Sequence, residues 1–348
     1  MPEPVRRLLL GLYHTSEAWT VPDAEVTRLR AEFPDVEVTR ATSREELAAG
    51  MPGAEILFSW APGEELARAA ARLRWIHTPA AGVGAYLTPS VLERGLVVTN
   101  SRGCHAIPIA EHVLGMLVAL ARRLRPAIEE QTTTGLRREN WWVGSAIPAE
   151  LYGRTLGLYG YGLIGREIAR RAVAFGMRVL AVRRDPARED DRDPALLSAL
   201  GLPAREPPVD AIMGPDGLDR LLGESDAVVI CAALTPETQG RFDAAAFGRM
   251  KPGAWLVNIA RGRIVREEDL VAALRGGQLG SAALDVFETE PLPHGSALYG
   301  LPNVLLTPHV SGLSTGFWPR AMALFRENLR RDADGLPLLN RVSFERGY

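Results

Sequence analysis

Three polar residues each follow an apolar run, and their types could together reduce a carbonyl group. Arg261 follows "WLVNIA", Glu290 follows "AALDVFET" and His309 follows "VLLTP". An arginine binds a carboxylate through two parallel hydrogen bonds. A histidine exchanges protons near neutral pH, and a neighbouring glutamate favours the charged imidazolium and orients its ring. Singly, each residue is more simply explained as a solvated or structural side chain, but the set suits reduction of a 2-keto acid beside a nicotinamide.

A glycine-rich segment, "TLGLYGYGLIGREIARRAVAFG", could bind that nicotinamide cofactor. It has the G-x-G-x-x-G spacing at Gly160, Gly162 and Gly165, after an apolar run and before a helical pattern. The first glycine permits a tight turn, the second lets the backbone approach a pyrophosphate, and the third allows the helix to pack on the strand. Leu163 and Ile164 begin the helix, whose N-terminal N–H groups would face the anion. The alternative is a glycine-rich turn with no ligand.

The elements that must position these residues form two strand–helix alternations. Residues 7–100 contain strand-like runs at "RLLLGLY", "VEVTR", "AEILFSW", "LRWIHT" and "LVVTN", and an amphipathic helix pattern at "DAEVTRLRAEF". From Leu156 onward, six further strands are predicted at "LGLY", "RVLAV", "AVVICA", "WLVNI", "AALDV" and "VLLT". Such alternation predicts an α/β fold with parallel sheets. Ligands bind beyond the carboxyl ends of such strands, which is where the three polar residues fall.

Three further segments complete this organisation. Residues 104–125 predict one long helix opening near Pro108, and its apolar residues on more than one face suggest burial between domains or subunits. Residues 184–217 are charged and rich in proline and glycine, which predicts a mostly exposed excursion with one short helix at "PALLSAL". The stretch "RAMALFRENLRRDADG" predicts a last helix that packs on the first domain.

Composition excludes several functional classes. The chain has 348 residues, 47% of them hydrophobic, and a net charge of −2, which is typical of a soluble protein with two domains. This charge gives no reason to expect nucleic acid or a membrane surface as a partner, and the longest apolar run is too short to span a bilayer. Cys104 and Cys231 are isolated, so we expect no metal site. The N-terminal run predicts a strand rather than a signal peptide, so we expect a cytoplasmic protein.

Longer stretches resemble one known family. They are "AAGVGAYL", "IAEHVLGMLVALARR", "LYGRTLGLYGYGLIGREIARRAVAFGM", "LTPETQGRFD", "VNIARGRIVREEDLVAALRGGQLGSAALDVFETEPLP" and "NVLLTPHVSG", which together cover most of residues 75–312. The sequence thereby resembles the NAD(P)-dependent D-isomer-specific 2-hydroxyacid dehydrogenases. The resemblance implies two doubly wound domains. A flavodoxin-like substrate domain would comprise residues 1–102 plus 316–348, and a Rossmann dinucleotide-binding domain residues 103–315.

The resemblance also assigns roles to individual residues. Arg261 would bind the substrate carboxylate with help from the backbone N–H groups of Gly82 and Val83; the alternative for this pair is a tight loop with no ligand. His309 would be the acid/base and Glu290 its partner. Three more residues are assigned to cofactor binding: Thr235, Ala260 and Asp285. Asp285 would lie near the nicotinamide carboxamide, or else merely end a strand. The sequence departs from the family at Gly84, where an aspartate is usual, and at Ala232 and Ala233.

Cofactor preference depends on the end of the strand "VLAV". In family members that prefer NAD, a ribose-binding aspartate stands eighteen residues after the third glycine, and that position here is Arg183. An arginine pairs with a 2′-phosphate as a charge-assisted fork. We therefore expect NADP(H) to be preferred over NAD(H), with Arg183 as the main 2′-phosphate ligand and Arg184 as a helper. The alternative is that both arginines are solvated and Asp185 reaches the ribose.

The predicted activity is reduction of a short 2-keto acid, glyoxylate-like, hydroxypyruvate-like or larger, to the D-2-hydroxy acid. The competing hypothesis is a non-catalytic NAD(P)-sensing protein of the corepressor type on the same fold. The apolar helix from Ile109 to Leu120, with Trp141 and Trp142 nearby, predicts a homodimer interface, unless it is buried within one chain. Large aromatic residues could line the substrate pocket or belong to the core; they are Trp60, Tyr86 and Trp318.

Overall fold

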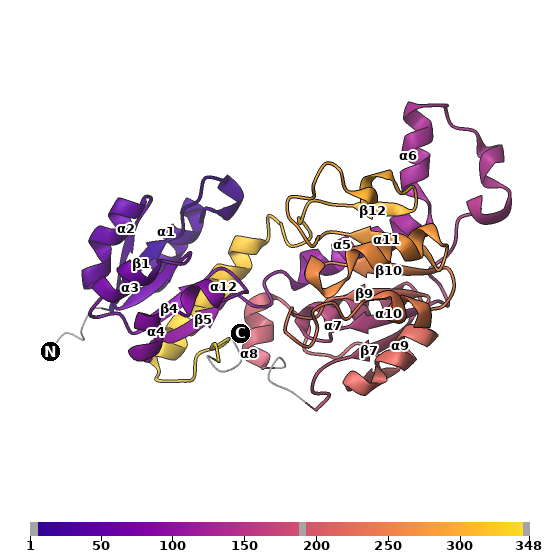
Figure 1. The fold of residues 1–348 in the computed structure, drawn as a ribbon. Coiled ribbons are helices and arrows are strands. Elements are labelled where there is room, and N and C mark those ends of the chain that lie inside the picture. The colour runs from indigo at the N-terminus through magenta and orange to yellow at the C-terminus, as the bar shows by residue number, and fades with distance from the viewer. Residues whose placement is uncertain (1–5, 188–192, 344–348) are drawn as a thin grey trace. The chain divides into compact units, whose positions relative to one another are not determined.

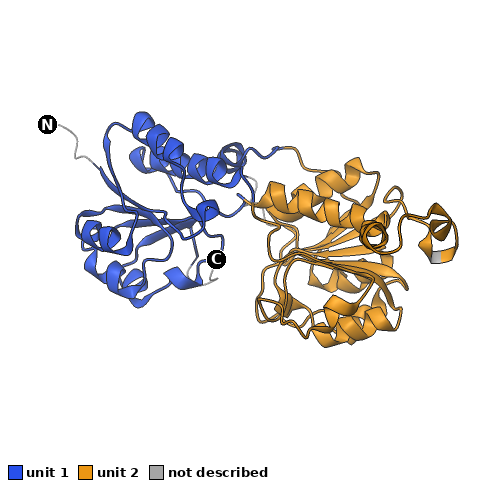
Figure 2. Ribbon diagram, turned by 90° about the horizontal axis from the view of Figure 1, so that it is seen from above, with its two compact units in different colours: residues 1–104, 192–204, 314–348 blue, residues 105–191, 205–313 orange. Residues whose placement is uncertain are grey.

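The computed structural model describes residues 6–187 and 193–343, and the chain separates into two compact units. Unit 1 comprises residues 1–104, 192–204 and 314–348, and unit 2 comprises residues 105–191 and 205–313 (Figure 2). The boundaries thus fall at 104/105 and 313/314. Residues 193–204 were expected within the dinucleotide-binding domain, but they belong to unit 1.

Unit 1 contains a five-stranded parallel sheet in the order β2-β1-β3-β4-β5 (Figure 1). Its strands are β1 (Arg6–Gly11), β2 (Val36–Arg40), β3 (Ile56–Ser59), β4 (Trp75–Thr78) and β5 (Val97–Asn100). The helices are α1 (Asp23–Glu32), α2 (Arg44–Gly50), α3 (Glu64–Ala69), α4 (Pro89–Glu93), α8 (Pro194–Leu200) and α12 (Phe317–Ala333). This is the strand order of flavodoxin-like sheets, which the family resemblance implied. Every residue of β3 and β4 is buried, as expected for strands covered on both faces.

Helix α8 explains why residues 193–204 belong to unit 1. The short helix itself was predicted, but the expectation of a mostly exposed excursion was wrong for this part. Leu196, Leu197 and Leu200 recur at helical spacing and are all buried, because α8 packs against α12.

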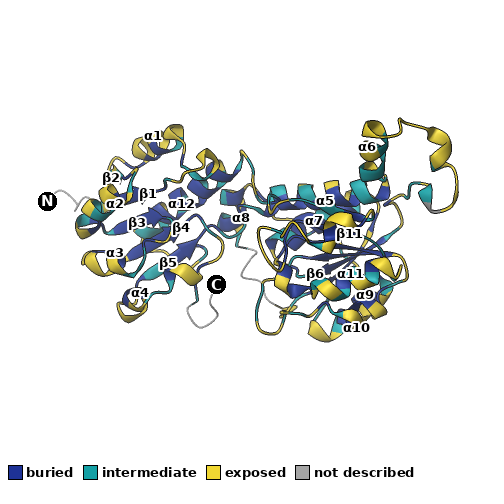
Figure 3. Cartoon of the chain, turned by 45° about the horizontal axis from the view of Figure 1, so that its top comes forward, coloured by how far each residue is buried: buried dark blue, intermediate teal, exposed yellow. Residues whose placement is uncertain are grey.

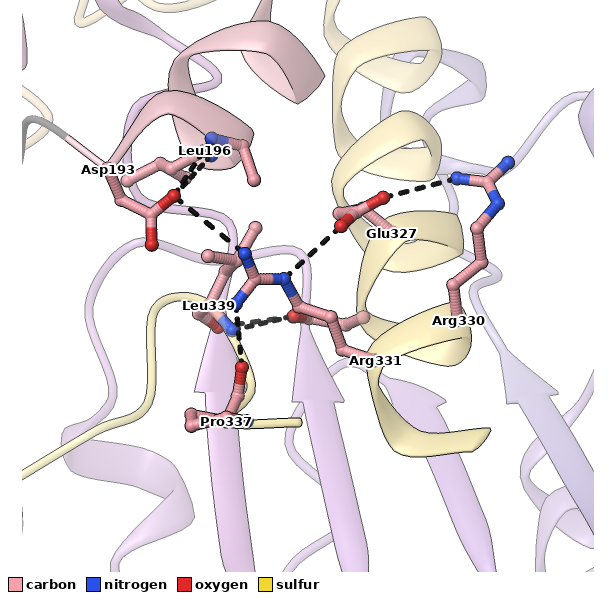
Figure 4. A network of polar contacts seen from close by, with 9 residues as sticks. Asp193, Leu196, Glu327, Arg330, Arg331, Pro337 and Leu339 are labelled. Atoms are coloured by element: carbon pink, nitrogen blue, oxygen red, sulfur yellow. Dashed lines mark hydrogen bonds and ion pairs between the residues drawn. The ribbon is translucent and has the colours of Figure 1, made fainter. Parts of the chain in front are cut away.

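Polar contacts fix the start of α8 on α12 (Figure 4). Asp193 caps α8 by accepting hydrogen bonds from the backbone N–H groups of Ala195 and Leu196. Its carboxylate also lies 3.8 Å from a guanidinium nitrogen of Arg331 on α12. Arg331 is itself held by Glu327, one turn earlier on the same helix. Asp193 therefore both caps the N-terminus of α8 and links α8 to α12.

Unit 2 contains a seven-stranded parallel sheet in the order β12-β11-β10-β9-β6-β7-β8. Its strands are β6 (Thr155–Tyr159), β7 (Arg178–Val182), β8 (Ala211–Met213), β9 (Ala227–Ile230), β10 (Ala254–Asn258), β11 (Leu279–Leu284) and β12 (Val304–Leu306). All six predicted strands are present. The sequence pattern missed β8, because it has three residues that are only partly buried. Counting β8 as the third strand gives the 3-2-1-4-5-6 order of a Rossmann domain plus one strand.

The helices of unit 2 cover both faces of this sheet and enclose its core. They are α5 (Ala106–Ala121), α6 (Leu124–Thr132), α7 (Leu163–Ala174), α9 (Leu218–Glu224), α10 (Ala244–Arg249) and α11 (Glu267–Arg275). The strands are buried throughout most of their length, whereas α6 and the segment after it are largely exposed (Figure 3). Within the described residues, no helix is both long and apolar enough to cross a membrane.

The long helix predicted for residues 104–125 is in fact two helices. Arg123 has a left-handed backbone conformation, with φ of 54°, between α5 and α6. Helix α5 belongs to the same core as β6 and α7, where Val113 and Leu117 are fully buried. Burial within one chain therefore accounts for many of the apolar residues of α5, and the homodimer interface expected on this helix stays a prediction.

Candidate active site

The three polar residues singled out in the sequence follow three neighbouring strands of unit 2. Strands β10, β11 and β12 are adjacent and parallel, so their carboxyl ends meet at one edge of the sheet. Arg261 follows β10, Glu290 follows β11 and His309 follows β12. The sheet thus assembles at one edge residues that are far apart in the sequence.

The structure pairs His309 with Glu290. The distance from His309 Nδ1 to Glu290 Oε2 is 2.6 Å, and the two side chains are 46% and 35% exposed. The other carboxylate oxygen of Glu290 accepts a hydrogen bond of 3.1 Å from the backbone N–H of Phe287, which orients the carboxylate. Because Nδ1 faces Glu290, Nε2 is the ring nitrogen that can exchange a proton with a substrate oxygen.

The backbone of His309 is held in an uncommon conformation. Its φ of 55° lies in the left-handed region, which residues other than glycine rarely adopt. Where they do adopt it, the residue often belongs to a functional site. The two N–H groups that follow it, those of Val310 and Ser311, both donate to the carboxylate of Asp285 at 2.9 Å. The Thr307 hydroxyl donates to the same carboxylate at 2.5 Å. Loop 307–311, which carries His309, is therefore folded around Asp285.

Asp285 is an anionic anchor beneath that loop. Its side chain has no exposed surface. Burial alone would raise the pKa of Asp285, but hydrogen bonds from Ser311, Thr307 and Val310 outweigh burial and lower it. Sequence reasoning missed this role, because the bonds join residues more than twenty positions apart. The predicted contact of Asp285 with the nicotinamide carboxamide stays a prediction.

The loop that carries Arg261 is shaped by two residues that the sequence reasoning did not single out. The buried amide of Asn258 donates to the carbonyl of Arg261 at 3.1 Å and accepts from the N–H of Ala260 at 3.0 Å. A Cβ at Gly262 would lie 1.8 Å from the carbonyl carbon of Phe287, so only glycine allows this approach. The Arg261 loop thereby packs against the backbone that leads to Glu290. In the sequence, the only hint of this close approach was that a glycine, Gly262, directly follows the candidate Arg261.

The glycine loop has the close approaches that the motif predicts. Gly160 has φ of 110°, and a Cβ there would lie 2.6 Å from the backbone nitrogen of Ala232. A Cβ at Gly165 would lie 2.6 Å from the carbonyl oxygen of Gly160. The loop joins β6 to α7, beside β9, where the strand order reverses. Gly162 is the N-cap of α7. These features fit a dinucleotide, which binds at such a switch point with its pyrophosphate at the helix N-terminus.

Arg183 directly follows β7, where a ribose-binding residue is expected. Its backbone N–H donates a hydrogen bond to the carbonyl of Met213 at 2.9 Å, so strand β8 holds the backbone of Arg183 in place. Asp185, the alternative ribose ligand, uses its carboxylate locally and accepts a hydrogen bond from the N–H of Ala187 at 3.0 Å. This local turn gives Asp185 a structural role that does not involve the ribose.

Arg184 lies close to the loop after β9, which carries Thr235. A hydrogen bond from Thr235 lowers the pKa of Glu237, and the positive charge of Arg184 lowers it further. The charge of Arg184 therefore acts on the loop that carries Thr235, and the cofactor-binding roles of both residues stay predictions. Among the described residues, no cluster of histidine, cysteine, aspartate or glutamate is arranged to hold a metal.

In unit 1, the predicted carboxylate contacts follow β4. The side chain of Val83 is buried, and its carbonyl accepts a hydrogen bond from the N–H of Tyr86 at 2.8 Å, which fixes the loop next to the exposed Gly82. Tyr86 is itself part of the core: it is buried, its hydroxyl bonds to Thr78, and burial raises its pKa to about 12.

The two tryptophans suggested as pocket residues pack in an aromatic cluster of unit 1. Trp318 is buried and donates from its indole to the carbonyl of Ala18 at 3.1 Å. Trp60 is half-buried and donates to the carbonyl of Trp19 at 3.2 Å. These bonds hold the segment after β1, which favours the core explanation for both rings.

Replacing Glu290 with glutamine tests the His309–Glu290 pair. The amide of glutamine can keep a hydrogen bond to Nδ1 but does not reproduce the carboxylate that holds the ring. We expect partial activity. Initial rates at saturating substrate measure the loss. Wild-type kcat would show that the carboxylate does not act on His309.

Comparison with known proteins agrees with this geometry. Residues 114–311 match the family model of the D-isomer-specific 2-hydroxyacid dehydrogenase NAD-binding domain. A glyoxylate reductase from Thermococcus onnurineus is 34% identical over 319 residues, which cover 89% of both chains. A D-3-phosphoglycerate dehydrogenase from Archaeoglobus fulgidus is 31% identical over 326 residues, 93% of this chain.

Solved structures share the whole architecture. A D-isomer-specific 2-hydroxyacid dehydrogenase family protein from Aeromonas salmonicida has a TM-score of 0.77 at 33% identity, covering 98% of this chain and 99% of that one. A D-isomer-specific 2-hydroxyacid dehydrogenase from Xanthobacter autotrophicus, in complex with NADPH and MES, has a TM-score of 0.74 at 27% identity, covering 99% and 100%.

The chain belongs to the D-isomer-specific 2-hydroxyacid dehydrogenase family. It spans only about half the length of the D-3-phosphoglycerate dehydrogenases that it matches, 58% in Archaeoglobus fulgidus and 46% in Synechocystis.

Proposed function

We propose that this protein reduces a short 2-keto acid to the D-2-hydroxy acid with NADPH. The observation that carries the proposal is the Glu290–His309 pair, at 2.6 Å, on the sheet edge that also holds the glycine loop. The glyoxylate reductase relative supports a small 2-keto acid as substrate. Turnover of NADPH with a panel of 2-keto acids tests the proposal.

In this reaction each residue has a defined task. Arg261 pairs with the substrate carboxylate through two charge-assisted hydrogen bonds, and the Gly82–Val83 backbone is a predicted second contact. His309 donates a proton from Nε2 to the substrate oxygen, while Glu290 holds the ring at Nδ1. Bound at the glycine loop, with Ala260 a further predicted contact, the cofactor supplies the hydride. Arg261 and His309 stabilise the charge that develops on oxygen, so they act more on the transition state than on binding.

The cofactor preference follows from the end of β7. Arg183 and Arg184 both carry positive charge where a ribose-binding acid would repel a 2′-phosphate, and Asp185 is engaged in a local turn. The Xanthobacter autotrophicus relative was solved with NADPH. We therefore propose that Arg183 is the main ligand of the 2′-phosphate and that Arg184 assists it.

Replacing Arg183 with alanine should weaken the preference for NADPH. Loss of one charge-assisted contact is worth about 1–3 kcal/mol, or roughly tenfold to a hundredfold in kcat/KM. The measurement is kcat/KM for NADPH and NADH in the wild type and in Arg183→Ala. Arg178→Ala is a matched control, because Arg178 lies at the other end of β7. Equal or better use of NADH by the wild type would contradict the proposal, as would an unchanged preference in Arg183→Ala.

We also propose that the protein is a homodimer, joined through the segment after α5. Helix α6 and the segment that follows project from the body of unit 2 (Figure 1). They expose several large apolar side chains: Leu136 at 69%, Trp142 at 60% and Val143 at 67%. Exposed apolar groups gathered on one segment are typical of an interface. Trp142 was predicted near the interface, and the expected contribution of α5 stays a prediction.

Sedimentation tests this arrangement. We expect a dimer at micromolar concentration in the wild type, and a shift towards monomer when Leu136 and Val143 are both replaced with serine. The matching double replacement at Leu92 and Tyr299, which are exposed elsewhere, should leave the dimer intact. A wild-type monomer would rule out the dimer, and a dimer that survives the Leu136 and Val143 replacements would place its interface elsewhere.

A further inference from the structure

A histidine that the proposed mechanism does not use lies behind the active-site loop. His112 is on α5, and its side chain is 23% exposed. Its Nε2 lies 3.1 Å from the Thr307 hydroxyl, and that hydroxyl lies 2.5 Å from the Asp285 carboxylate. His112, Thr307 and Asp285 therefore form a chain of hydrogen bonds that runs from α5 to loop 307–311.

The direction of these hydrogen bonds is set by chemistry. An ionised carboxylate only accepts, so the single hydroxyl proton of Thr307 is donated to Asp285. The hydroxyl oxygen must then accept from His112, which places a proton on Nε2 of that ring. Burial lowers the pKa of His112, although the charge of Asp285 opposes this effect. The ring can therefore serve as a neutral donor whose tautomer is fixed by Thr307.

We infer that His112 is a positioning residue for the acid/base His309, acting through Thr307 and Asp285; this inference rests on the proposed function. The carboxylate at the centre of the chain accepts the N–H groups of Val310 and Ser311, which come directly after His309. A Thr307 hydroxyl held by His112 keeps that carboxylate in one orientation. The carboxylate in turn keeps the left-handed turn at His309 that presents the imidazole to Glu290.

Two matched pairs of variants test the inference. Thr307→Val removes the hydroxyl while keeping the shape of the side chain, and Thr307→Ser keeps the hydroxyl. His112→Leu removes the donor, and His112→Gln keeps an N–H donor on a side chain that can reach Thr307. We expect Thr307→Val and His112→Leu to lower kcat by about tenfold, the size of effect that one lost hydrogen bond can produce. Thr307→Ser and His112→Gln should stay within about threefold of the wild type.

Comparing the effect on kcat with the effect on NADPH binding distinguishes a positioning role from a general loss of structure. The dissociation constant for NADPH, measured by fluorescence titration, should change by less than about twofold in all four variants. Combining His112→Leu with Thr307→Val should give no greater loss of kcat than either change alone, because both break one chain. Additive losses, or wild-type kcat in His112→Leu, would overturn the inference.

A readout that needs no turnover distinguishes failure of this inference from failure of the proposed function. Imidazole NMR of the wild type should show His112 protonated at Nε2, and the His309 ring signals should shift in Thr307→Val but not in His294→Gln, where an exposed histidine is replaced. Unmoved His309 signals in Thr307→Val would overturn the positioning role. Absence of any 2-keto acid reduction by the wild type would instead reject the proposed function.

Discussion

Replacing His309 with glutamine should lower kcat by about 10²–10⁴, the usual contribution of general acid catalysis. Glutamine fills similar space but cannot deliver a proton to the substrate oxygen. The loop should keep its shape, because Asp285 holds it through the N–H groups of Val310 and Ser311 and not through the imidazole. Stopped-flow or steady-state rates with saturating NADPH and 2-keto acid measure the effect.

Cofactor binding provides the control for that experiment. The glycine loop and the end of β7 are separate from His309, so NADPH affinity should stay close to the wild-type value in His309→Gln. His294→Gln, which changes an exposed histidine of unit 2, should leave kcat unaltered. Near-normal turnover in His309→Gln would remove His309 from the mechanism.

Replacing Arg261 with methionine should lower kcat/KM by about 10²–10⁴, with most of the loss remaining at saturating substrate. Two charge-assisted hydrogen bonds of about 1.5–3 kcal/mol each would be lost. Arg261→Lys keeps the positive charge but cannot form two parallel hydrogen bonds to the carboxylate, so it should retain only part of the activity. Arg263, two residues further along the chain, donates to Gln239 and offers the control variant Arg263→Met.

The two arginine variants also separate charge from geometry. Full activity in Arg261→Lys would show that a point charge is enough, and wild-type kcat/KM in Arg261→Met would show that another group binds the carboxylate. The fold should tolerate either change, because the Arg261 side chain is exposed and the loop is shaped by Asn258 and Gly262.

Much of the fold follows from local patterns that the sequence displays directly. Buried parallel strands appear as short apolar runs, and most of the strands could be placed from those runs. The sequence pattern missed β8, because "AIM" is short and only partly buried. The break between α5 and α6 was missed although Pro126 lies in the first turn of α6; the break itself occurs at Arg123, which has a left-handed conformation. The docking of α8 depends on α12, which is more than a hundred residues away, so it could not be derived locally.

The residues of the candidate site also fall into two groups, those that local sequence patterns reveal and those that only distant contacts reveal. Residues that directly follow strands, such as Arg261 and His309, could be chosen from their position and chemistry. Residues that support them through distant contacts could not. Asn258 shapes the Arg261 loop from within β10, and Gly262 matters only because the Phe287 backbone lies against it. His112 reaches Thr307 across 195 positions of sequence.

The proposed activity is tested by the rate of NADPH oxidation by the wild type with glyoxylate, hydroxypyruvate and bulkier 2-keto acids, with the product resolved by chiral chromatography. We predict reduction of at least one of these acids to the D-2-hydroxy acid, with a rate that falls by about 10²–10⁴ in His309→Gln. Binding of NADPH without turnover of any acid in the panel, with either NADPH or NADH, would contradict the account and would favour a cofactor-sensing protein on the same fold.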